Sequence, residues 1–464
     1  MRQHPRPRGH QLALRPGPGR RPGRGAPVLS RPERARRAGV RCCLVTTHPT
    51  PPATPSLVVV TEAVEVAAVE ALLDHLPRTE PVTWLRNGEG MVGWGVAARV
   101  RTSGSTRFRD ADKWWSELCD QAQVRDEVDE PGTGLVAFGS FAFADHPGDS
   151  VLTVPSVLLG RRGSVAWRTT VHVAGAPTPA DVEVEPVVAP TGVLFSDGAL
   201  DGETWMGVVA DAVDRINAGD LEKVVLARDL IATADAEVDV RAPVAHLATH
   251  YPTCWTFHVD GMFGATPEML VRRERGLVTS RVLAGTIRRT GDDERDLALA
   301  ATLARSSKDL EEHEYAVRSV ADALEPHCSS MNVPESPFVL HLPNVMHLAT
   351  DVNGVVHDAA TVSSLRLAES LHPSAAVGGT PTPVAVALIA EIEGMDRGRY
   401  AGPVGWIDAD GDGEWGIALR SASVEGAQVR LFAGCGIVGD SAPEAELAES
   451  QAKFVPVRDA VTGA

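Results

Sequence analysis

The run at residues 223–234, KVVLARDLIATA, is apolar on both faces of the strand that its composition favours. Alternation along a strand places Val225 and Ala227 on one face and Val224 and Leu226 on the other. A strand that is apolar on both faces must be covered on both sides. We therefore expect this segment to be a central strand inside a layered fold that combines sheets and helices.

Lys223, which opens this strand, is an unusual choice for this chain. The sequence has 44 Lys and Arg residues, and only four of them are lysines: Lys113, Lys223, Lys308 and Lys453. Arginine cannot lose its proton in a protein, whereas a desolvated lysine can. Lys223 is therefore either a candidate base or a strand-end residue that extends its ammonium to water.

Two helical patterns adjoin chemically interesting positions. Residues 201–220 have apolar side chains at helical spacing, and Gly219 fits the end of that helix. In the second pattern, at 310–327, Glu312 shares the apolar face with Val320. A carboxylate on a buried face is costly unless it is paired or binds a metal, so Glu312 is a candidate ligand.

The segment 427–457 reads as a strand, a glycine turn and a helix. Ser441 and Glu444 have capping-box spacing at the start of that helix. Glu446, Glu449 and Lys453 then fall on one face, which fits either a solvated stripe with a Glu449–Lys453 pair or a functional cluster. The glycines match G-x-G-x-x-G, but too few residues follow for the second strand of a dinucleotide-binding unit.

A β-hairpin is expected at residues 400–424, with its tip at the sequence DADGDG. This tip resembles the first half of a calcium-binding loop. Position 12 of such a loop, counted from Asp408, is Leu419, where a bidentate glutamate is required. We interpret it as a turn, and a calcium-binding protein remains the alternative.

Charge divides the chain into two parts. Residues 1–50 contribute +11 to a formal net charge of −17, so the remainder carries −28. The Arg-, Pro- and Gly-rich head cannot build a core, and we interpret it as a disordered extension, with a nucleic-acid arm or targeting segment as alternatives. The acidic remainder argues against a nucleic-acid partner.

Composition narrows the remaining classes. The apolar content of 44% is that of an ordinary soluble protein, and no run approaches the length of a transmembrane helix. Six scattered cysteines without metal-binding spacing fit a reducing, cytoplasmic compartment. Residues 51–195 read as strands and turns, and a Pro- and Ala-rich stretch at 176–191 reads as a surface connection.

Several blocks in the second half together resemble the chorismate-utilising enzymes, and in particular the isochorismate synthases. The blocks, in order, are KVVLAR, FGATPEMLVRRERG, RVLAGTIRR, SSKDLEEHEYAV, VMHLAT, LHPSAAVGGTP, RYAGPVGWID, GDGEWGIALRSA, RLFAGCGIV and PEAELAESQAKF. The match is strong over residues 199–460, weaker over 51–195 and absent from 1–50. The resemblance implies an α+β fold with two facing β-sheets flanked by helices, built by one catalytic domain at 51–464.

The resemblance also implies roles for individual residues. Lys223 would be the base that activates water, and Glu268 the general acid. Glu312 and Glu449 would hold Mg²⁺, with Glu446 acting through water. The positions that match substrate contacts are Gly285, His347, Ser374, Tyr400, Arg420, Gly434 and Gly436.

The implied activity is Mg²⁺-dependent conversion of chorismate to isochorismate, by a protein expected to be a cytoplasmic monomer that serves menaquinone or siderophore biosynthesis. Amine-transferring relatives lack the lysine, so Lys223 favours water as the nucleophile. A salicylate synthase, which goes on to expel pyruvate from isochorismate, is the alternative. An anionic substrate fits a local site of positive charge or a bound cation in an otherwise acidic protein.

Overall fold

The computed structural model describes residues 55–341 and 345–464, apart from the side chains of Thr286, Lys308, Asp309 and Glu312. The extension expected at residues 1–50 lies outside the described residues. Ala53–Ala464 forms one compact unit.

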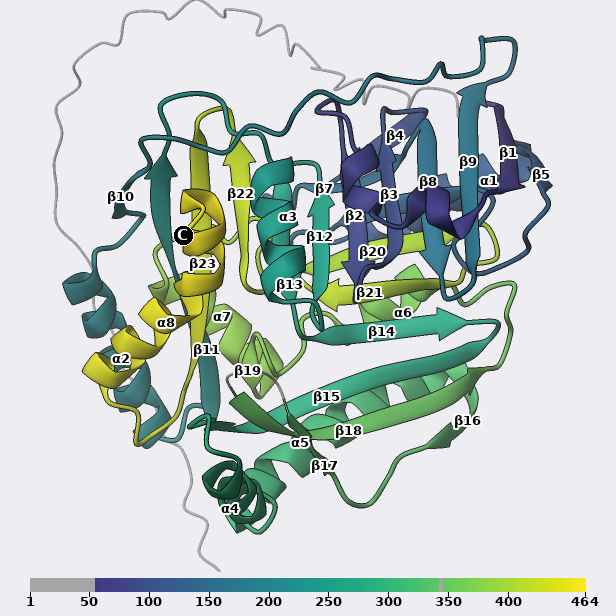
Figure 1. The fold of residues 1–464 in the computed structure, drawn as a ribbon. Coiled ribbons are helices and arrows are strands. Elements are labelled where there is room, and N and C mark those ends of the chain that lie inside the picture. Colours follow the sequence, from purple (N-terminus) through teal and green to yellow (C-terminus); the bar gives the residue numbers. More distant parts are fainter. Residues whose placement is uncertain (1–54, 342–344) are drawn as a thin grey trace, which may run out of the picture. The chain divides into compact units, whose positions relative to one another are not determined.

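Two large β-sheets organise this unit (Figure 1). The strands of the first sheet, in spatial order, are β10 (Leu194–Asp197), β11 (Lys223–Thr233), β23 (Gln428–Ile437), β22 (Ser421–Glu425), β13 (Met262–Thr266), β12 (Trp255–Val259), β2 (Val82–Arg86), β3 (Glu89–Trp94), β8 (Val157–Arg162), β9 (Val165–Val173), β1 (Leu57–Ala63) and β5 (Gln123–Asp126), with β19 (Gly379–Thr380) paired to β11. Those of the second are β16 (Cys328–Asn332), β18 (Val345–Val356), β15 (Leu277–Arg288), β14 (Met269–Glu274), β21 (Gly413–Ile417), β20 (Pro403–Asp408), β6 (Val136–Ser140), β7 (Ser150–Val154) and β4 (Ala98–Thr102), with β17 (Phe338–His341) paired to β18.

Helices lie on the outer sides of both sheets. They are α1 (Arg107–Gln121), α2 (Gly202–Asn217), α3 (Arg241–His250), α4 (Asp293–Leu303), α5 (Ser307–Leu324), α6 (Ser364–Leu371), α7 (Thr382–Ile392) and α8 (Pro443–Thr462), with 3-10 turns at Val66–Val69, Leu72–His75 and Glu325–His327. Helices α2, α3 and α8 contact the first sheet, and α4, α5 and α6 contact the second. The α+β fold with two sheets flanked by helices is confirmed.

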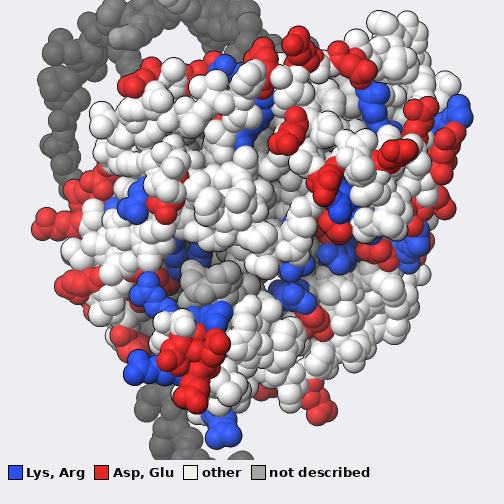
Figure 2. All heavy atoms as spheres, viewed as in Figure 1, with Lys and Arg blue, Asp and Glu red and all other residues white. Residues whose placement is uncertain are grey.

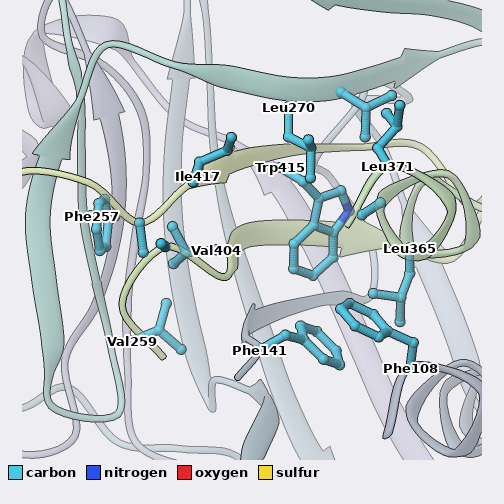
Figure 3. Packing of buried hydrophobic residues seen from close by; sticks show 14 of the residues in the cluster. Phe108, Phe141, Phe257, Val259, Leu270, Leu365, Leu371, Val404, Trp415 and Ile417 are labelled. Atoms are coloured by element: carbon cyan, nitrogen blue, oxygen red, sulfur yellow. The ribbon is translucent and has the colours of Figure 1, made fainter. Parts of the chain in front are cut away.

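The core fills the space between the two sheets and the space between the sheets and their helices. Phe108 of α1 stacks on Phe141 at a centroid distance of 4.4 Å, and Phe141 meets the edge of Trp415 from β21 at 5.6 Å. Figure 3 shows these rings beside Leu365 and Leu371 of α6. Trp84 of the first sheet donates a 2.7 Å hydrogen bond to Glu414 of the second, so polar as well as apolar contacts join the sheets.

The expectation of strands and turns alone at 51–195 was wrong, because α1 lies in this segment. Its buried residues include Phe108, Ala111, Trp115 and Leu118, which have the spacing of one helical face. The connection at 176–191 has no regular structure and is almost wholly exposed, as expected. Within the described part of the chain, no helix combines the length and the apolar character that a membrane crossing requires.

Candidate active site

Lys223 lies at the start of β11, and its backbone is paired with Thr380 of β19. Its side chain crosses the neighbouring strand β23 at Gly436. A Cβ atom on Gly436 would lie 2.9 Å from Cε of Lys223 and 3.5 Å from its Nζ. A side chain larger than that of glycine at this position would displace the end of the lysine side chain, because Cβ contacts below 3.0 Å are essentially never seen.

Tyr400 approaches the same strand two residues earlier. A Cβ atom on Gly434 would lie 3.0 Å from the Tyr400 hydroxyl. The Tyr400 ring stacks on Phe432 at 5.0 Å, and burial raises the pKa of its hydroxyl, which therefore stays protonated. The expected glycine turn is present at Gly439, between β23 and α8. Gly434 and Gly436 lie inside β23, where their missing side chains leave room for Tyr400 and Lys223.

Glu268 and Arg420 occupy two of the connections that pass from one sheet to the other. Glu268 lies between β13 of the first sheet and β14 of the second. Arg420 lies between β21 of the second sheet and β22 of the first, with a positive φ of 48°. The site therefore forms where the sheets separate, and both side chains are held there by strand ends.

The carboxyl of Glu268 is set for proton transfer near neutral pH. Burial raises its pKa to about 7, while the positive charges of Arg420, Lys223 and Lys453 act in the opposite direction. These opposing effects place the carboxyl near three cations, one of them the candidate base. A carboxyl with a pKa near the working pH can serve as a general acid.

His347 and Gly285 come from the second sheet. Gly285 has a φ of 76° and lies where the β15–β18 pairing shifts register, at a β-bulge. Burial, then the charges of Arg420 and Lys453, lower the pKa of His347 to about 4, although a hydrogen bond with the Gly285 backbone opposes this. His347 is therefore neutral at pH 7 and can bind substrate through a hydrogen bond without adding charge.

Ser374 has a buried hydroxyl with no hydrogen-bond partner among the described residues. Its carbonyl accepts bonds from Val377 and Gly378 at 3.2 and 2.9 Å, so the backbone at this turn is fixed. A buried hydroxyl without a partner is unusual in a folded protein. The position suits a group that bonds to a ligand.

Helix α8 supplies the carboxylates proposed for the metal. Ligand atoms of Glu446, Glu449 and Cys435 lie within 4.8 Å of one another. The Cys435 thiol donates to the Glu446 carbonyl at 3.4 Å, and burial raises its pKa to about 12. The hard donors of this cluster are therefore the two carboxylates, and oxygen donors are those that Mg²⁺ prefers.

The expected capping box between Ser441 and Glu444 was wrong. Helix α8 begins later, at Pro443, where the absence of an N–H costs no hydrogen bond. The Ser441 hydroxyl instead donates to the Glu446 carboxylate at 2.7 Å. It thereby orients a side chain of the carboxylate cluster.

Lys453 belongs to the site. The sequence had left open whether its helix face was solvated or functional. Its Nζ donates to the Gly434 carbonyl at 2.8 Å and pairs with Glu449 at 2.5 Å. Its charge also acts on the pKa values of Glu268 and His347. The expected Glu449–Lys453 ion pair is present. It points toward β23 and the site, so this face of the helix is more than a solvent-exposed row of charges.

Glu312 lies in α5, but its side chain is outside the described residues, so its role as a metal ligand stays a prediction.

At the DADGDG turn, the Asp408 carboxylate accepts hydrogen bonds from the backbone N–H groups of Gly132, Asp410 and Asp412. The Asp412 carboxylate pairs with Arg273 at 2.6 Å. These carboxylates are engaged within the protein, which supports the interpretation as a hairpin tip.

Comparisons with known proteins agree with this geometry. A family model described as "Chorismate binding enzyme" matches residues 50–462. The chain is 31% identical over 404 residues to isochorismate synthase MenF of Bacillus subtilis, covering 80% of this chain and 85% of that protein. It is 32% identical over 413 residues to the salicylate biosynthesis isochorismate synthase of Pseudomonas aeruginosa, covering 83% and 85%.

A solved structure extends the likeness to three dimensions. The menaquinone-specific isochorismate synthase MenF of Escherichia coli has a TM-score of 0.74 at 26% identity, covering 88% of this chain and 95% of that one. The family match spans nearly all described residues, including every residue of the site. The chain therefore belongs to the chorismate-binding enzyme family.

Proposed function

We propose that the protein is an isochorismate synthase, which converts chorismate to isochorismate. The observation that carries the proposal is the position of Glu268 near Lys223: burial raises the pKa of this carboxyl to about 7, against the charges of Arg420, Lys223 and Lys453. Relatives named isochorismate synthases support the same assignment.

The reaction needs one base and one acid. Lys223, when neutral, takes a proton from water as the water oxygen bonds to ring carbon C2. The ring double bonds shift, the bond between C4 and its hydroxyl breaks, and Glu268 gives its proton to the leaving hydroxyl, which departs as water. General acid–base catalysis of this kind typically contributes about 10²–10⁴-fold to the rate.

The cations of the site suit a dicarboxylate substrate. Arg420 can form charge-assisted hydrogen bonds to one carboxylate. The hydroxyls of Ser374 and Tyr400 and the neutral ring of His347 can complete the polar contacts. Because these three groups are uncharged, they do not repel the amine of Lys223 electrostatically.

We also propose that Glu446, Glu449 and Glu312 hold Mg²⁺. The cation would neutralise charge on the substrate carboxylate in a protein whose formal net charge is −17. Glu449 and Glu446 are the members of this set whose side chains the structure describes, and their oxygens fit a hard cation.

The deciding experiment is product analysis. The protein is incubated with chorismate and Mg²⁺, with and without EDTA, and products are separated by chromatography. Isochorismate without pyruvate supports the proposal, whereas stoichiometric pyruvate with salicylate would assign a salicylate synthase. Failure to consume chorismate under both conditions would refute either activity.

A further inference from the structure

Three arginines lie together outside the residues that match substrate contacts. They are Arg86 at the end of β2, Arg272 in β14 and Arg281 in β15. Burial lowers the pKa of Arg86, and the charges of Arg281 and Arg272 lower it further, whereas Glu414 opposes them. The positive charges of neighbouring guanidinium groups repel one another, and together they create a region of positive electrostatic potential.

Carboxylates only partly neutralise this cluster. Arg281 makes two hydrogen bonds to Asp351, at 2.7 and 2.8 Å, and Arg272 pairs with Glu414. Among the described residues, Arg86 forms no ion pair. Three guanidinium groups thus face two carboxylates, and the cluster keeps a net positive charge.

The geometry of Arg86 fixes its charge in place without neutralising it. Its Nε donates to the Thr253 carbonyl at 2.9 Å, and its guanidinium lies 4.1 Å above the ring of Trp255. Nε of Arg272 is buried and has no hydrogen-bond partner among the described residues. The side chains of Arg272 and Arg281 are 40% and 27% exposed, so an anion in solution can approach them.

The cluster adjoins the candidate active site. Cys254, next to β12, experiences the charges of both Arg420 and Arg86, which oppose the effect of burial on its thiol pKa. Arg420 of the site and Arg86 of the cluster therefore both lie near this thiol. Arg86 also lies over Trp255, which is paired with Thr266, two residues before Glu268. Figure 2 shows that basic and acidic side chains are interspersed on this face of the molecule.

We propose that Arg86, Arg272 and Arg281 form a capture patch that draws an anionic dicarboxylate toward the site. This inference rests on the proposed function, because chorismate is the dicarboxylate in question. Residues 51–464 carry a net charge of −28, which repels a dianion at a distance. A positive patch beside the site raises the local concentration of the substrate, and salt screens this effect.

The test replaces Arg86 by glutamine, because that change leaves no carboxylate without its partner. The Kd of chorismate is measured from tryptophan fluorescence after rapid mixing, before turnover, at about 10 mM and about 300 mM salt. One charge about 10 Å from a dianion in water corresponds to roughly threefold in affinity at low salt. We expect Arg86→Gln to bind about threefold more weakly at low salt and like the unmodified protein at high salt.

Two matched variants complete the design. Arg86→Lys keeps the charge and should restore the affinity. Arg125→Gln removes one positive charge from β5, an edge strand separated from β2 by four other strands, and should leave Kd unchanged. The proposal would be overturned if the Kd of chorismate depended equally on salt in Arg86→Gln and in the unmodified protein. It would also be overturned if Arg125→Gln weakened binding as much as Arg86→Gln does.

Binding is measured before any product forms, so this test is separate from the proposed reaction. A protein that binds chorismate but makes no isochorismate would refute the isomerase and still give a valid result for the patch.

Discussion

The carboxylate of Glu393 and the guanidinium of Arg397 form a buried ion pair that holds the strand carrying Lys223. The pair is joined by two hydrogen bonds, at 2.7 and 2.6 Å. Arg397 also donates to the carbonyls of Val225 in β11 and Val377 in the turn after Ser374, at 2.7 and 3.0 Å. The pair therefore fixes two parts of the candidate site relative to each other.

Removing one partner should destabilise the protein strongly. Arg397→Met leaves the Glu393 carboxylate buried without its cation, and breaking such a pair costs about 3–5 kcal/mol. The midpoint of urea unfolding measures this loss. Arg318→Met breaks an exposed pair with Glu314 and should cost less than about 1 kcal/mol; equal midpoints for the two variants would contradict the prediction.

Lys223→Arg separates charge from basicity. Arginine keeps the positive charge but cannot become neutral, so turnover should fall by about 10²–10⁴-fold, nearly as far as in Lys223→Ala. Glu268→Gln should lose a similar factor. Initial rates together with chorismate binding check both variants, and near-normal turnover in Lys223→Arg would remove the assigned base.

Gly436→Ala tests the path of the lysine without touching its chemistry. The added Cβ would lie 2.9 Å from Cε of Lys223, so the amine must move. We expect turnover to fall at least tenfold while the unfolding midpoint changes little. Gly207→Ala on α2 meets nothing within 4 Å and serves as the control that should keep full activity; unchanged turnover in Gly436→Ala would show that the lysine does not need this space.

The activity of the protein should fall as pH rises through the pKa of Glu268. The acid must be protonated to donate, and its pKa of about 7 places the midpoint of this decline near neutral pH. The charge of Lys453 lowers this pKa, so Lys453→Met should shift the decline to higher pH in whatever activity remains. Rates measured from pH 6 to 9 check both statements. If activity declines at the same pH in Lys453→Met and in the unmodified protein, the charge of Lys453 does not affect the pKa of the acid.

Loss of Glu449 should appear as a weaker requirement for the cation. Glu449→Gln removes one carboxylate from the proposed Mg²⁺ site and releases Lys453 from its ion pair. We expect the Mg²⁺ concentration for half-maximal activity to rise at least tenfold. The matched change Glu444→Gln, on an exposed residue at the start of α8, should leave it unchanged, and an equal effect of the two changes would argue against Glu449 as a ligand.

Local patterns predicted the elements better than the connections between them. The periodicity around Trp205 and the double-sided strand after Lys223 gave α2 and β11, because both depend on residues close in sequence. The glycine turn after β23 was predicted, but the sequence did not show that Gly434 and Gly436 lie inside the strand, since glycine serves turns and close contacts alike. At Gly436 the close contact is with Lys223, more than 200 residues away along the chain.

Other parts of the site depend on long-range contacts that no spacing encodes. Ser374 becomes an unpartnered hydroxyl only through the packing around its turn. The pKa of Glu268 depends on burial and on cations from three separate segments. Arg86 gains its neighbours from strands β14 and β15, so the capture patch could not be read from the sequence.

Helix α8 follows every other described element along the chain, yet it carries Glu446, Glu449 and Lys453. A break in the chain between Ile437 and Pro443 would thus keep every strand of both sheets and remove Glu446, Glu449 and Lys453 together. It would also uncover the core residues that Phe454 and Val457 of α8 cover, so the shortened protein would lose stability along with these charged groups.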